Sequence, residues 1–123
     1  MATTVTIKGL KQLERKLGRL PADIQRASMK AVKDEVKETG TDMRRLAPKK
    51  TGFLADSVQE ELTSGGLGGK VWPRARYAKF VNDGARGVAA QPFATATGKL
   101  TRKRFKKRTI EITNKALRKV ARG

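Results

Sequence analysis

Residues 22–46 read ADIQRASMKAVKDEVKETGTDMRRL, and apolar or small side chains recur along them at the three- and four-residue steps of a helix. These side chains are Ile24, Ala27, Ala31, Val32, Val36, Met43 and Leu46. Pro21 precedes the stretch and suits the first turn of a helix, while Gly40 weakens it. The stretch therefore predicts one long helix of 25 residues, with a length of roughly 37 Å.

Acidic and basic side chains alternate on this predicted helix. The acids are Asp34, Glu35, Glu38 and Asp42, and the bases at helix-pair spacings from them are Lys30, Lys33 and Lys37. Neighbouring carboxylates on a helix point about 100° apart, so Asp34 and Glu35 do not converge on one site. We interpret the set as ion pairs along a solvated or subunit-facing helix surface, rather than as a catalytic or metal-binding group.

The residues before the long helix predict one strand and one shorter helix. Residues 3–8 alternate and are rich in β-branched side chains, which is typical of a strand. Leucines at helical spacing over residues 10–20 predict an amphipathic helix that ends before Pro21.

The residues after the long helix predict a hairpin. Residues 57–63 and 70–74 have strand character, and the Gly-rich residues 64–69 join them as a flexible tip. The tip does not match a phosphate-binding loop, because Ser64 stands at the first Gly position and Val71 follows Lys70.

The remaining residues predict two more helices. Residues 76–82 form a short helix that stops at Asp83-Gly84. Residues 85–91 form a loop, and a last helix runs from about residue 94 to 120 and frays near Gly98. The whole chain predicts one α+β domain over residues 1–123, in which helices flank a small antiparallel sheet.

The composition excludes several classes of chemistry. With no His and no Cys, the chain has no imidazole acid-base catalysis, thiol nucleophile, disulfide or zinc cluster. No residue set indicates a catalytic, cofactor-binding or metal site, so we expect a protein that is not an enzyme and needs no cofactor. No apolar run is long enough for a membrane span and residues 1–9 lack a signal-peptide core, so the sequence predicts a cytoplasmic protein without membrane contact.

The charge is large and uneven. The chain has 29 basic and 11 acidic residues, a net charge of +18, and residues 63–123 have 16 basic against two acidic residues. Such a charge, combined with a hydrophobic fraction of 37%, favours a protein stabilised by polyanions or by neighbouring subunits.

The basic segment of residues 99–123 contains the densest run of charge. Its first ten residues hold seven cations, namely Lys99, Arg102, Lys103, Arg104, Lys106, Lys107 and Arg108. Cations of this density bind DNA phosphates without sequence specificity, and they would equally dock on an acidic protein surface. Phe105 is the only aromatic residue of the run, so base stacking does not decide between the two.

Three sequence clusters together resemble one family. Residues 47–58 read APKKTGFLADSV, residues 77–84 read YAKFVNDG, and residues 91–93 read QPF. Their order and spacing are similar to the small head-tail junction proteins of tailed bacteriophages, the neck or tail-completion proteins. The resemblance covers roughly residues 10–120, and it departs at residues 82–85, where NDGA replaces the commoner acidic-Gly-Thr turn.

The residues that carry the resemblance suit structural roles. They are Pro48, Thr51, Gly52, Leu54, Tyr77, Gly84, Pro92 and Phe93. We expect Pro48 and Gly52 to turn the chain into the sheet, with Thr51 capping the short turn that follows and Leu54 filling the core. Tyr77 and Phe80 would pack the short helix, and a positive φ is expected at Gly84. Pro92 and Phe93 would then anchor the last helix.

The resemblance implies a function in virion assembly. It implies a non-enzymatic, neck-like domain of a siphovirus-like tail that forms a ring, a hexamer, at the head-tail junction and joins the tail to the DNA-filled head. Its partners would be adaptor or stopper proteins, tail terminator or tube proteins, and the packaged DNA. The protein would be located in the host cytoplasm during assembly and then in the virion. The alternative is a free-standing, sequence-neutral nucleic-acid-binding protein.

Overall fold

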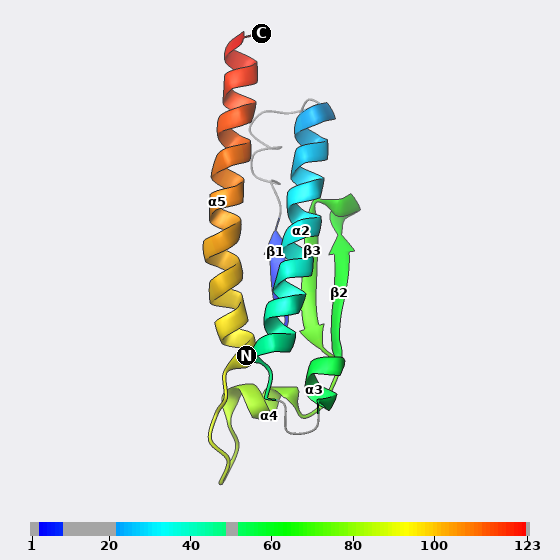
Figure 1. Ribbon diagram of the computed structural model, residues 1–123, viewed down its shortest axis with the longest axis vertical. Coiled ribbons are helices and arrows are strands. Elements are labelled where there is room, and N and C mark those ends of the chain that lie inside the picture. The colour runs from blue at the N-terminus through cyan, green and yellow to red at the C-terminus, as the bar shows by residue number, and fades with distance from the viewer. Residues whose placement is uncertain (1–2, 9–21, 49–51, 123) are drawn as a thin grey trace.

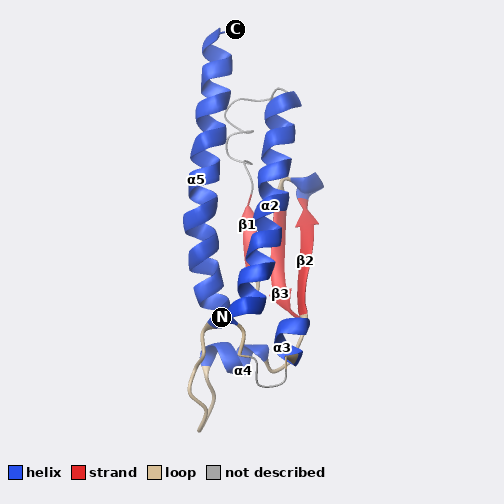
Figure 2. Cartoon of the chain, in the orientation of Figure 1, coloured by secondary structure: helices blue, strands red, loops and turns tan. Residues whose placement is uncertain are grey.

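A three-stranded sheet and two long helices make up most of the molecule (Figure 1), as seen in a computed structural model that describes residues 3–8, 22–48 and 52–122. The elements are β1 (Val5–Lys8), α2 (Ala22–Leu46), α3 (Phe53–Asp56), β2 (Val58–Thr63), the 3-10 turn η1 (Ser64–Gly66), β3 (Gly68–Pro73), α4 (Ala78–Asp83) and α5 (Phe93–Arg122). Figure 2 shows how the helices lie against the strands. The predicted α+β class, long helix and small antiparallel sheet are confirmed, and the predicted helix over residues 10–20 lies outside the described residues.

The sheet has the order β1-β3-β2, and both neighbouring pairs are antiparallel. The predicted hairpin is β2 with β3, in which Glu60 pairs with Val71. β3 begins at Gly68, two residues earlier than Lys70, because η1 closes the turn within three residues. Gly65 and Gly66 adopt positive φ angles of 64° and 94° there, a conformation that glycine tolerates best.

One face of the sheet packs on α2 and forms the core. Val5 and Ile7 of β1 and Val71 of β3 meet Val32 and Val36 of α2. Gly69 is part of this contact as well, because a Cβ atom added to it would lie 2.3 Å from Cγ2 of Val36. The glycines of the hairpin therefore allow close packing of helix on sheet, in addition to closing its tip.

The last helix, α5, runs antiparallel to α2 and lies beside it (Figure 1). It is continuous from residue 93 to 122, so the predicted fraying near Gly98 is wrong. Packing holds this part of the helix, because Thr97 and Thr101 are buried on either side of Gly98, and the Thr97 hydroxyl donates to the Phe93 carbonyl at 2.8 Å.

The short helix α4 lies with α3 at one end of the molecule (Figure 1). Gly84 follows it with the predicted positive φ, of 84°. Tyr77 and Phe80 were predicted to pack this helix, but their side chains are 40% and 59% exposed. The prediction fails because α4 buries only Ala78 and Asn82, and the Tyr77 ring stacks instead on Phe53 of α3, with 6.2 Å between the ring centroids.

Candidate interface on the basic helix

The seven cations of residues 99–108 fall on three sides of α5. Residues four apart share one side of a helix, so the run separates into a pair, a second pair and a triplet. The pairs are Arg104 with Arg108 and Arg102 with Lys106, and the triplet is Lys99, Lys103 and Lys107. Each side has different surroundings.

The first pair faces the acidic side of α2. Arg104 Nε donates to Oε2 of Glu35 at 2.7 Å, and Arg104 Nη1 donates to Oδ2 of Asp42 at 2.8 Å. Arg108 Nη2 donates to Oε1 of Glu38 at 2.6 Å. Glu35 is fully buried, so the Arg104 guanidinium compensates a carboxylate that has no access to water.

The surroundings of Arg104 favour its charged form. Partial burial removes water from the guanidinium and opposes the charge, but hydrogen bonds and charge from Glu35 and Asp42 outweigh that effect and raise the pKa of Arg104. Beside this cluster, the hydroxyls of Thr39 and Thr101 lie 2.7 Å apart and are buried. The contact between α2 and α5 is therefore polar at its centre.

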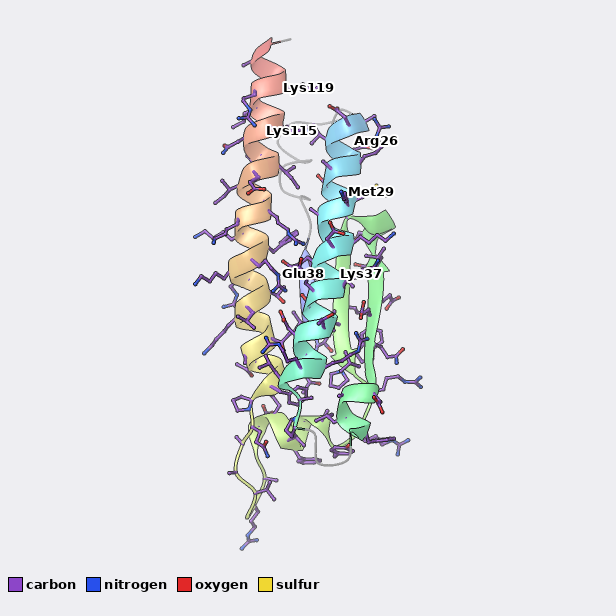
Figure 3. All side chains as sticks on the ribbon, in the orientation of Figure 1. Arg26, Met29, Lys37, Glu38, Lys115 and Lys119 are labelled. Carbon is purple, nitrogen blue, oxygen red and sulfur yellow. The ribbon has the colours of Figure 1, made fainter. Side chains whose placement is uncertain are left out.

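This arrangement corrects the prediction of ion pairs within α2 in its main part. Glu35, Glu38 and Asp42 form one side of α2 and bind arginines of α5 rather than lysines of their own helix. Within α2, Asp42 also pairs with Arg45, at 3.3 Å. Figure 3 shows Glu38 on the α5 side of α2 and Lys37 on the other side. The three- and four-residue spacing that suggested helix-internal pairs also places the acids on one contact face.

The second pair lines a groove beside the sheet. Arg102 and Lys106 lie with Gly98 and Phe105 along a half-open groove of about 450 Å³ between α5 and β1. Among the described residues, neither Arg102 nor Lys106 forms an ion pair. Two cations thus line a groove beside β1, whose outer edge pairs with no other described strand.

The triplet faces solvent. Lys99, Lys103 and Lys107 are exposed, and none of them forms an ion pair within the described part of the chain. Four-residue steps place their ammonium groups in a row along α5. Such a row is chemically suited to phosphates or carboxylates of another molecule.

Most residues that carried the family resemblance surround the ends of α3, α4 and α5. Leu54 and Phe93 are buried in the core, and Gly52 has a positive φ of 75°. Pro48 is half-buried and Pro92 is exposed, while Thr51 lies outside the described residues.

Sequence reasoning missed the role of Asn82. Its side chain is buried, and its Oδ1 accepts the backbone N–H groups of Ala94 and Thr95 at 3.0 and 3.2 Å. Pro92 directly precedes α5, so the helix has no Ser, Thr, Asp or Asn at its N-cap position to accept these N–H groups. That lack was the available signal that a residue from elsewhere must cap the helix.

The described residues contain no group of three or more acidic side chains arranged to hold a metal ion. Nor does any helix in this part of the chain combine the length and apolarity required to span a bilayer.

Comparison with known proteins identifies the family. Residues 11–84 match the HK97-gp10-like family, whose description reads "Bacteriophage HK97-gp10, putative tail-component". No curated protein and no solved structure matches the chain. The matched range spans more than half of the 123 residues and includes α2, the hairpin and α4. The chain belongs to the HK97-gp10-like family of bacteriophage tail components.

Proposed function

We propose that this tail component acts at the head-tail junction, where it forms a hexameric ring that completes the tail and joins it to the DNA-filled head. The protein acts by binding rather than by catalysis, as one domain over residues 1–123. Its neighbours are adaptor or stopper proteins and tail terminator or tube proteins, and its final location is the junction of the virion. The family match supports a tail component, and the resemblance of residues 47–58, 77–84 and 91–93 to neck proteins supports the junction.

The exposed row of Lys99, Lys103 and Lys107 is the observation that carries the proposed mechanism. Facing the channel of a ring, such a row meets the phosphates of the DNA that passes from head to tail. Contacts of this kind release counterions and carry no sequence information. They suit a junction, because every sequence of the genome must pass through it.

The net charge of the chain supports an assembly role as well. A charge of +18 on 123 residues destabilises the isolated compact state at low salt. DNA or acidic neighbours would neutralise this charge and add their binding free energy to the stability of the fold. The protein is therefore expected to be more stable in the particle than alone.

The salt dependence of DNA binding tests the role of the lysine row. A variant with Lys99, Lys103 and Lys107 replaced by Gln should bind duplex DNA with a slope of log K against log salt that is smaller by about 3. The matched control replaces Arg74, Arg76 and Lys79, three exposed cations near α4, and should keep the original slope. Fluorescence anisotropy of labelled DNA measures both.

Particle assembly tests the junction itself. The lysine-row variant should reduce the yield of DNA-filled particles that carry tails, whereas the control variant should not. Unchanged assembly and DNA retention would contradict the proposed DNA contact. A monomer or dimer that binds DNA steeply with salt and never joins tails would instead support the free-standing nucleic-acid-binding protein.

A further inference from the structure

Within the described part of the chain, the sheet has two unpaired edges, which lie on opposite sides of the molecule. In the order β1-β3-β2, the outer strands each pair with β3 alone among the described residues. An edge strand presents unpaired N–H and C=O groups that can bind another strand. Figure 1 shows α5 along one side of the molecule and β2 along the other.

As far as the described residues extend, the β1 edge has room for one more strand. Helices pack about 10 Å apart and strands about 4.8 Å apart, so two helices cover about four strands. The layer of α2 and α5 lies over only three described strands. The groove of about 450 Å³ between β1 and α5 is where a fourth strand would lie.

The β2 edge has the side chains that this groove would accept. Leu62 is 45% exposed although it pairs with Gly69, whose missing Cβ would point at Val36 of α2. Leu62 is therefore an uncovered apolar side chain on the helix-facing side of the sheet. Glu60 lies two residues before it and shares that side, because strand residues alternate between faces.

We propose that β2 of one copy lies in the groove of the next copy and pairs with its β1, so that the sheet continues from subunit to subunit. The proposal rests on the proposed ring and names the contact that closes it. β1 and β2 run in the same direction, because both are antiparallel to β3. A rotation about an axis along the strands therefore pairs β2 with the neighbouring β1 in parallel. A contact between two different surfaces of the same chain forms a ring when the rotation that relates neighbouring copies closes on itself.

The two surfaces complement each other in shape and charge. Leu62 enters the space beneath α5 that Gly98 leaves open, beside Phe105. The carboxylate of Glu60, 2.7 Å from Arg44 in its own chain, meets Arg102 and Lys106 of the neighbour. A second copy is the occupant favoured by the structure, because its own edge strand supplies both the apolar and the acidic side chain.

Cysteine cross-linking tests this contact, since the chain has no cysteine of its own. The two single variants are Thr6→Cys on β1 and Gln59→Cys on β2. Both side chains are exposed on the sheet face away from α2. With a short bismaleimide at moderate salt, a mixture of the two single variants should give a cross-linked dimer, and each variant alone should not. A chain carrying both should give a ladder that ends at the number of subunits in the ring.

A charge-reversal pair tests the chemistry of the groove. Arg102→Glu with Lys106→Glu should lower the cross-linking yield about tenfold. Lys115→Glu with Arg118→Glu, at exposed positions of α5 outside the groove and the lysine row, changes the net charge equally and should leave the yield unchanged.

The results of these experiments distinguish a failure of the proposed contact between β1 and β2 from a failure of the proposed ring. A ring in light scattering without the mixed cross-link, or cross-linking of Gln59→Cys with itself, would overturn the contact and leave the ring intact. A monomer at every concentration and salt would overturn both. Cross-linking that the groove variant and its control reduce equally would overturn the charge complementarity.

Discussion

Glu35 of α2 and Arg104 of α5 are 69 positions apart in the chain and meet at 2.7 Å. Glu35 is completely buried, whereas Arg104 keeps 28% of its side chain exposed. The pair thus fixes the register of the two long helices, because a shift of either helix would leave a buried carboxylate without its cation.

Loss of Arg104 should destabilise the protein strongly. Arg104→Met leaves the buried carboxylate of Glu35 uncompensated, and we expect the free energy of unfolding to fall by about 3 kcal/mol. Urea denaturation measures the change, with the neighbouring Lys103→Met as the solvent-exposed control. Equal urea midpoints for the two variants would show that the pair does not hold the helices together. Adding Glu35→Leu to Arg104→Met should restore part of the loss, because the buried charge is then absent.

Asn82 should contribute through the start of α5. Asn82→Ala removes the acceptor of the Ala94 and Thr95 N–H groups and should lower the free energy of unfolding by about 1 to 2 kcal/mol. Asn114→Ala, on the exposed side of the same helix, is the control and should have little effect. Hydrogen exchange at residues 94 and 95 should accelerate only in the first variant. Unchanged protection of these amides would contradict the cap.

Two glycines should respond oppositely to alanine. Gly69→Ala places a Cβ against Val36 in the core and should destabilise by about 1 to 3 kcal/mol. Gly98→Ala places its Cβ no closer than 4.0 Å to Val5 and should stabilise α5 by up to about 1 kcal/mol. Thermal unfolding of both variants measures the two signs, and a stabilised Gly69→Ala would contradict the close packing of α2 on β3.

The pair of Asp23 with Lys119 links the far ends of α2 and α5 and should depend on pH. The hydrogen bond from Lys119 lowers the pKa of Asp23 below its ordinary 3.8, against a smaller opposing effect of desolvation. Since the folded pKa is the lower one, the stabilisation is present above pH 3.8 and is lost as the pH falls through the folded value. Carboxyl NMR titration should show the low pKa, and Lys119→Gln should return it toward the ordinary value. An unchanged titration in Lys119→Gln would contradict the pair.

Local sequence patterns were sufficient for the strands and the longer helices that the structure describes. Alternation in residues 3–8 and 57–63 depends only on which face of a strand is buried, so the strands were predictable. The long helix was predictable for the same reason, since its apolar spacing is a local property. Gly98 was judged by its helix propensity alone, and burial of α5 against α2 overrides that preference.

The candidate interface was predictable in composition but not in orientation. The run of residues 99–108 is visibly basic, yet which side of α5 meets α2 depends on the register of two helices that are far apart in sequence. Two of the seven predicted contacts, Arg104 and Arg108, are engaged within the chain for this reason. The cap from Asn82 was missed likewise, because it joins a short helix to the start of another element.

The pairing of α2 with α5 also bears on synthesis of the protein. Translation produces α2 long before α5, so Glu35, Glu38 and Asp42 remain in water while the ribosome is still making the hairpin and α4. The carboxylate of Glu35 can be buried only after residue 104 has left the ribosome. A nascent chain released before that point therefore lacks the cation that pairs with Glu35, and the acidic face of its α2 stays in water.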